Sequence, residues 1–178
     1  CQWNDHEALT LAQNGLLAWK TPVDMRLHAE ILGRIGAKSS VPLLLKAAAL
    51  DVPFDRVLEH AITFALIEIA EKHATGDGLI SESPRARRIT LIALDQMPGA
   101  GLTPEWVVPL LASTDTPLRD TALWLVNRHP EWGEALGAYL EQQLARQEWT
   151  EAEQQNLEAL LARFASTPSV QSLLAKQV

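Results

Sequence analysis

A short period shared by two residue types constrains this chain more than any other feature. Prolines lie 31, 31 and 33 residues apart, at Pro22, Pro53, Pro84 and Pro117. Arginines lie 30, 32 and 31 residues apart, at Arg26, Arg56, Arg88 and Arg119. A regular period of this length is typical of helical solenoids, in which each helix pair buries its apolar face by stacking on the next pair.

Apolar residues recur at helical spacing along the chain, while strand signals are almost absent. One such stripe comprises Leu58, Ala61, Ile62, Ala65 and Ile69. Each stripe covers about a third of a helix surface, which is the width that buries one side against neighbours. We therefore predict an all-α fold, and we expect Trp124 to lie in the core within the stripe that starts at Leu118.

The breaks between stripes carry helix-end signals. A Ser or Thr precedes Pro, as expected for an N-cap followed by the first helical residue, at Thr21-Pro22, Ser83-Pro84, Thr103-Pro104, Thr116-Pro117 and Thr167-Pro168. Thr150 and Glu153 form a capping-box pattern, and Gly36 is placed to end a helix. The helices are therefore predicted to be short.

These signals predict a helical solenoid of about five helix pairs. Residues 1–20 are expected to form an N-terminal capping helix before a repeat array at 21–178. The approximate repeats are 21–50, 52–80, 83–113, 115–146 and 150–178. In the second repeat we expect a long first helix, from Pro53 to about Lys72, and a weak second helix.

Composition narrows the functional classes. The 178 residues are 47% apolar, enough to bury a core, and the net charge of −7 argues against a nucleic-acid surface, because such surfaces need clustered cations. No apolar run is long enough to span a membrane. We expect the chain to be a piece of a longer protein, although a terminal Cys1 would also suit a mature lipoprotein.

Motifs that carry chemistry are missing from the sequence. There is no nucleophile elbow, no phosphate-binding loop and no pair of histidines four residues apart. We interpret His28 and His60 as hydrogen-bonded structural histidines. No catalytic residue, cofactor or metal is predicted, and the chain is expected not to be an enzyme.

The residues that could contact a partner are few. Arg85, Arg87 and Arg88 form the one basic cluster, and Arg119, Trp106 and Trp132 are further candidates. The alternative is structural. The tryptophans would cover the joints between repeats, and the periodic arginines would form a ladder with acids one repeat away, chosen from Asp24, Asp55, Glu82, Asp115 and Asp120. Three cations at a helix N-terminus oppose the helix dipole, so an acidic or anionic neighbour is expected there.

The order of Pro, Arg and aliphatic residues in each unit resembles the HEAT repeat. This resemblance implies a HEAT-like solenoid, which is a right-handed α-α superhelix. A closer resemblance is carried by LEHAITFALIEIA at 58–70, SPRARRITLIALDQMPGAGLTPEWVVPLLAS at 83–113 and TPLRDTALWLVNRHPEWGEALGAYL at 116–140. These segments are similar to the HEAT region of large secreted planctomycete-type proteins, which join a dehydrogenase-like propeller through HEAT repeats to a c-type haem module. The resemblance covers about 58–145.

The resemblance implies a non-catalytic scaffold or protein-interaction module within a larger redox protein, with an extracytoplasmic location. Its partners would be another protein or neighbouring domains of the same polypeptide. No haem attachment carries over, because the C-x-x-C-H motif is absent from this sequence. The alternative function is a nucleic-acid-binding or DNA-repair enzyme on a HEAT-like scaffold, which would need a basic concave face.

Overall fold

The computed structural model describes residues 5–18 and 21–176, and within these ranges every regular element is a helix. The all-α prediction is therefore confirmed. The chain forms two compact units, one ending at Leu102 and the other starting at Thr103. This boundary divides the predicted repeat 83–113, since its first helix belongs to the first unit and its remaining helices to the second.

The first unit contains six α-helices and two short 3₁₀ helices among its described residues. They are α1 (Asp5–Ala18), α2 (Pro22–Ile35), η1 (Lys38–Ser40), α3 (Val41–Ala49), α4 (Arg56–Ile69), α5 (Lys72–Gly76), η2 (Asp77–Ile80) and α6 (Pro84–Gln96).

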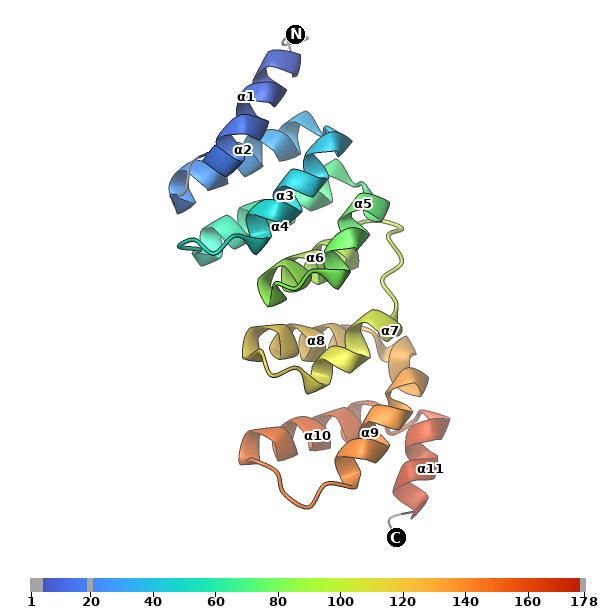
Figure 1. Cartoon of the computed structure of the whole chain (residues 1–178). Helices are drawn as coiled ribbons and strands as arrows, with labels where there is room; N and C mark the ends of the chain where they lie inside the picture. Colours follow the sequence, from blue (N-terminus) through green and yellow to red (C-terminus); the bar gives the residue numbers. More distant parts are fainter. Residues whose placement is uncertain (1–4, 19–20, 177–178) are drawn as a thin grey trace. The chain divides into compact units, whose positions relative to one another are not determined.

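The helices of this unit form two layers. In one layer α4 packs between α2 and α6, and in the other α3 packs between α1 and α5. Figure 1 shows α1, α3 and α5 in front of α2, α4 and α6. The core between the layers is aliphatic, with Leu32, Leu44 and Ile62 fully buried. Each helix therefore buries its apolar stripe against the opposite layer and against its neighbours within the layer.

Helices α2 and α4 approach closely because of a small-residue contact. Gly33 is buried on α2, and a Cβ atom placed there would lie 2.9 Å from the Cα atom of Ala65 on α4. Such a separation leaves no room for a side chain. The missing side chain at Gly33 thus sets the distance between these two helices.

The second unit contains the remaining helices of the described chain. They are α7 (Pro104–Val107), η3 (Val108–Ala112), α8 (Thr116–Arg128), η4 (Pro130–Leu136), α9 (Gly137–Leu144), α10 (Glu151–Arg163) and α11 (Pro168–Lys176). The α7–η3 segment packs on α8, and α11 packs on η4 and α9. Its core includes Leu125, Leu136 and Phe164.

Most of the predicted helix ends are confirmed, but Thr103 precedes α7 without a side-chain cap hydrogen bond. Thr21 and Ser83 accept hydrogen bonds from the backbone N–H groups of Asp24 and Ala86. Thr150 and Glu153 form the predicted capping box. Gly36 ends α2 in the left-handed conformation, with a φ of 71°.

Two helix starts differ from prediction. Helix α8 is capped by Asp115 and not by Thr116, because the Asp115 carboxylate accepts the N–H of Leu118. Helix α4 begins at Arg56 after the cap Asp55, so Pro53 lies outside it, and it ends before Ala70 and not near Lys72. At the start of α8 the Asp115 carboxylate, two residues before Pro117, therefore takes the N-cap position in place of the Thr116 hydroxyl.

The expected weak second helix of the predicted repeat 52–80 is a short α5 followed by η2. Within the range 1–20 the structure places α1, which packs against α2 and α3. Trp3, Trp19 and Cys1 lie outside the described residues.

Candidate functional site

Arg85, the first residue of the predicted basic cluster, binds the end of another helix. Its Nε donates to the carbonyl oxygen of Ala48 at 3.0 Å, and a terminal NH₂ group donates to that of Leu50 at 2.6 Å. Its guanidinium also lies 4.0 Å above the ring of Phe54. A cation at the C-terminus of α3 is favourable because it satisfies free carbonyls and complements the helix dipole.

Arg87 closes a local arrangement at the start of α6. Its Nε donates to the carbonyl oxygen of Ser81 at 2.6 Å. The hydroxyl of Ser81 in turn accepts the N–H of Ser83, the residue that caps α6. The guanidinium is therefore held by the loop that precedes its own helix.

Arg119 takes the same place at the start of α8. It donates to the carbonyl oxygen of Ser113 at 3.4 Å, and the Ser113 hydroxyl accepts the N–H of the cap residue Asp115. Since Ser113 follows Ser81 by 32 residues and Arg119 follows Arg87 by 32, the structural equivalent of Arg119 is Arg87. The period at Arg88 and Arg119 is thus one residue out of register.

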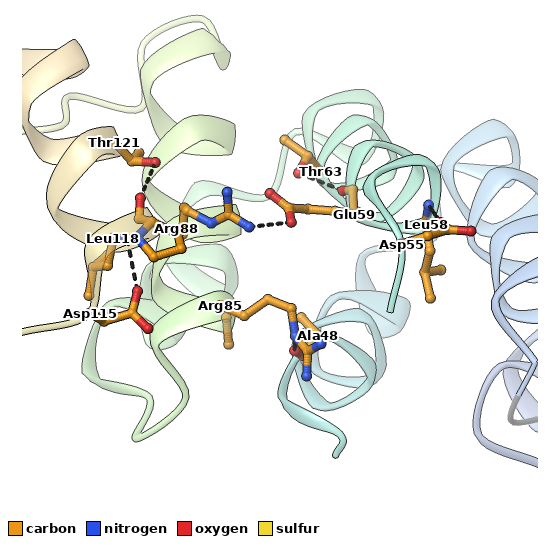
Figure 2. A network of polar contacts seen from close by, with 12 residues as sticks. Ala48, Asp55, Leu58, Glu59, Thr63, Arg85, Arg88, Asp115, Leu118 and Thr121 are labelled. Atoms are coloured by element: carbon orange, nitrogen blue, oxygen red, sulfur yellow. Dashed lines mark hydrogen bonds and ion pairs between the residues drawn. The ribbon is translucent and has the colours of Figure 1, made fainter. Parts of the chain in front are cut away.

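Arg88 has the acidic neighbour that the cluster was expected to have. Figure 2 shows its guanidinium on α6 pointing at the carboxylate of Glu59 on α4, with which it forms an ion pair. The two side chains are 26% and 17% exposed. All three arginines of the cluster therefore have acceptors within the first unit.

The predicted ladder of arginines and acids does not extend to the other members. Arg26 pairs with Glu30 of its own helix, at 3.5 Å. Arg56 has no ion pair among the described residues. The acid that Arg88 uses, Glu59, was not among the acids expected for the ladder, which included Asp55 and Asp115; those two cap helices instead.

The three tryptophans near joints and stripes have different environments. Trp106 on α7 is 46% exposed, whereas Trp132 is 6% exposed. The ring of Trp132 stacks on His129 with centroids 4.0 Å apart, so it has little surface to offer a partner. The prediction that Trp124 lies in the core is wrong: it is 41% exposed and lies under the guanidinium of Arg128.

A groove lies between α4 and α6 in the first unit, with a volume of about 560 Å³. Phe54, Phe64, Ile67 and Ile92 supply its apolar lining. Its polar lining comes from Asp55, Arg56, Glu59, His60, Thr63, Arg88 and Gln96. This volume is within the range of binding clefts, while most of the residues that line the groove are polar or charged.

A second, smaller groove of about 240 Å³ lies on the other side of α4, against α2. Val57 lines this groove only, while His60 and Phe64 line both. Val57 and Phe64 are 53% and 46% exposed, and the rings of His60 and Phe64 are stacked. The outward face of α4 is thus an apolar and aromatic ridge between two grooves.

His60 therefore differs from its predicted structural role, since it is exposed on this ridge. His28 agrees with the prediction: its Nδ1 makes a hydrogen bond of 2.7 Å with the carbonyl oxygen of Asp24.

The sequence analysis did not predict the ridge on α4, although the spacing of its residues could have indicated it. Val57, His60 and Phe64 are spaced three and four residues apart, which places them on one helix face. That face is distinct from the buried stripe of Leu58, Ala61 and its neighbours. Apolar residues outside the buried stripe of a helix are the pattern that would have identified it.

The described residues hold no cluster of three or more His, Cys, Asp or Glu side chains that would suit a metal ion. In the same residues, no helix has the length and apolar character needed to cross a membrane.

Comparison with known proteins gives no family. A scan against protein-family models finds no match, and a search of the curated proteins returns no significant relative.

Proposed function

We propose that this chain is a HEAT-like solenoid that binds a protein partner, or a neighbouring domain of the same polypeptide, and has no catalytic role. The two-layer packing of the first unit is compatible with stacked helix pairs. The sequence resemblance to HEAT regions of larger redox proteins makes neighbouring domains of such a protein one source of partners.

The observation that carries the proposal is the exposed ridge on α4. Val57 and Phe64 expose about half of their side chains, and the grooves beside them are rimmed by charged residues. Protein interfaces combine an apolar or aromatic centre with a polar rim in this way. A partner that covers these side chains would remove apolar surface from water, which stabilises a complex.

The position of the ridge recurs in the second unit. Phe64 follows the N-cap Asp55 by nine residues, and Trp124 follows the N-cap Asp115 by nine residues. The equivalent residue of α6, nine after Ser83, is Ile92. Phe64 and Trp124 are exposed at this position, whereas Ile92 is half-buried. Equivalent residues at one position of successive first helices fit a repeat architecture.

The charged residues of the two grooves do not favour binding of a nucleic acid. Arg34 pairs with Glu68 at 3.4 Å beside the smaller groove, and Arg88 pairs with Glu59 in the larger one. Phosphate backbones are bound by several cations that are free to neutralise them. The nucleic-acid alternative therefore has less support than a protein partner.

The purified chain would be used as bait in an extract of its source organism, next to Phe64→Ala and Trp124→Ala variants. These two variants are matched, because each removes one exposed aromatic residue from the same position of a first helix. We expect a partner that the parent and Trp124→Ala recover and that Phe64→Ala loses. Circular dichroism of all three proteins checks that they are folded.

Loss of the partner with Trp124→Ala alone would place the binding face in the second unit and refute the role of α4. Recovery of no partner by the folded parent would refute the binding function and leave a spacer between domains. Tight binding of a DNA duplex at physiological salt would favour the nucleic-acid alternative.

A further inference from the structure

The charged residues that line the larger groove differ in their partners, and Arg56 has no acceptor within the part of the chain that the structure describes. The groove is lined by the acids Asp55 and Glu59 and by the cations Arg56 and Arg88. Three of these four have partners. Arg56 is exposed at the first position of α4, and no hydrogen bond or ion pair among the described residues involves its guanidinium.

The three other charges are held by the fold. The Asp55 carboxylate accepts the N–H of Leu58 at 2.7 Å, as the N-cap of α4. Glu59 and Arg88 form an ion pair, which Figure 2 marks with a dashed line. Among the described residues that line this groove, Arg56 is therefore the one arginine left for an incoming group. An arginine presents a planar fork of donors that fits a carboxylate.

The wall next to these charges is apolar. Phe64 stands at the edge that separates the two grooves, and Ile67 and Ile92 are half-buried between α4 and α6. Such a wall fits a large aliphatic or aromatic side chain, whose burial supplies affinity that an exposed ion pair does not. The groove thus offers one cationic contact and one apolar contact.

We propose that the groove between α4 and α6 receives a segment of a partner protein that carries an acidic side chain beside a large apolar one. The carboxylate pairs with Arg56, and the apolar side chain packs against Phe64 and Ile92. This inference rests on the proposed protein-binding function and specifies the chemistry of the partner. A carboxylate is favoured over a phosphate because one unpaired cation balances a single negative charge. A second negative charge would be repelled by the nearby carboxylates of Asp55 and Glu59.

The test is selection of peptides from a displayed random-peptide library on the intact chain. We expect the parent to enrich peptides that combine Asp or Glu with an aromatic or aliphatic residue. Arg56→Glu reverses the charge and should enrich peptides with Lys or Arg in place of the acid. Phe64→Ala should lose the enriched peptides of the parent.

Affinities of one selected acidic peptide make the test quantitative. Arg56→Gln should weaken its binding about two- to fivefold, as for an exposed ion pair. Arg56→Glu should weaken it about tenfold or more, since like charges then face each other. Ile80→Ala is the control, because Ile80 is an exposed apolar residue of the first unit that lines neither groove, and it should leave the affinity unchanged.

The variants are chosen to fold. Arg56 occupies the first turn of α4, where a negative charge is favourable, and Phe64 is an exposed side chain. Unchanged unfolding temperatures would establish this, and Arg56→Gln replaces Arg56→Glu if the charge reversal unfolds the chain.

Enrichment of peptides without acidic residues, or of acidic peptides that bind Arg56→Glu equally well, would overturn the inference. So would the absence of any enriched peptide. A protein partner that is lost with Phe64→Ala, combined with a peptide preference that ignores Arg56, would leave the proposed function standing and remove only the inference about the acidic residue.

Discussion

Arg88 on α6 forms an ion pair with Glu59 on α4, and the fold shields both side chains, which are 26% and 17% exposed. The backbone carbonyl oxygen of Glu59 also accepts the Thr63 hydroxyl at 2.8 Å within α4. The pair therefore joins two adjacent helices of one layer at the edge of the larger groove.

Breaking this ion pair should destabilise the first unit. We expect Arg88→Met and Glu59→Gln each to lower the free energy of unfolding by about 1 to 3 kcal/mol, because each leaves a shielded charge without its partner. Since the two residues are in contact, the double variant should cost less than the sum. Urea unfolding of the four proteins measures the coupling, and purely additive costs would show that the pair contributes nothing.

Removal of the Arg85 guanidinium should loosen the end of α3. Arg85→Met retains the aliphatic stem but removes the donors to Ala48 and Leu50. Hydrogen bonds made by charged groups are worth about 1.5 to 3 kcal/mol each, and partial solvation reduces this, so we expect a loss of about 2 kcal/mol.

Arg85→Lys is the control for this position, because it keeps the charge and loses the fork that reaches two carbonyl groups. An intermediate stability in urea unfolding is expected. Equal stability of Arg85→Lys and the parent would mean that charge alone, and not the paired hydrogen bonds, holds this helix end.

Two helix ends with left-handed backbone should respond in opposite directions to exchange of Ala and Gly. Ala70 ends α4 with a φ of 54°, and Gly36 ends α2 with a φ of 71°. Ala70→Gly should stabilise the chain and Gly36→Ala should destabilise it, each by about 1 kcal/mol, because a Cβ atom is strained in this conformation. Thermal unfolding measures both, and a shift in the same direction for both variants would contradict the explanation.

Acid should weaken the start of α10 through Glu153. The backbone N–H and hydroxyl of Thr150 and the guanidinium of Arg146 lower the pKa of Glu153 to about 2 from the usual value of 4.5. The folded pKa is depressed, so the stabilisation is fully present above pH 4.5 and is lost as the pH falls towards 2.

The difference in unfolding temperature between the parent and Glu153→Gln should therefore be largest near neutral pH and shrink progressively below pH 4.5. Thermal scans across this range measure it. A difference that stays constant down to the lowest pH would show that ionisation of Glu153 does not support the capping box.

Local signals in the sequence were sufficient to predict the helical class and most helix ends. Thr21, Ser83 and Thr150 cap helices as predicted because a cap depends on a hydrogen bond to a backbone group only three residues away. The start of α8 was misassigned because Asp115 and Thr116 both satisfy that local rule, and the proline after them fits either choice.

The charged contacts were harder to predict. Arg88 pairs with Glu59, and Arg85 reaches Ala48, across 29 and 37 residues of sequence. Their choice depends on which helix faces the guanidinium after packing. The period of Arg56, Arg88 and Arg119 suggested one shared role, yet these residues stand one, five and four positions after their N-caps and so point in different directions.

The candidate site was missed for a related reason. Helical periodicity identifies the stripe that a helix buries, but it does not show how much of the opposite face neighbours cover. Trp124 was placed in the core on its spacing alone, and Phe64 was overlooked because it falls outside the stripe. Both lie nine residues after an N-cap, a relation that becomes visible only when the caps are assigned correctly.

The loops that precede α6 and α8 match each other, and this similarity is relevant to how a repeat chain lengthens by gene duplication. In each, a serine holds the cap residue through its hydroxyl and an arginine of the new helix through its carbonyl oxygen, all within seven consecutive residues. Nothing in that arrangement requires a distant part of the protein. A duplicated gene segment that begins with such a loop would encode all the residues that start its own helix. Further selection would then act on the surfaces through which the new helix pair stacks on its neighbours.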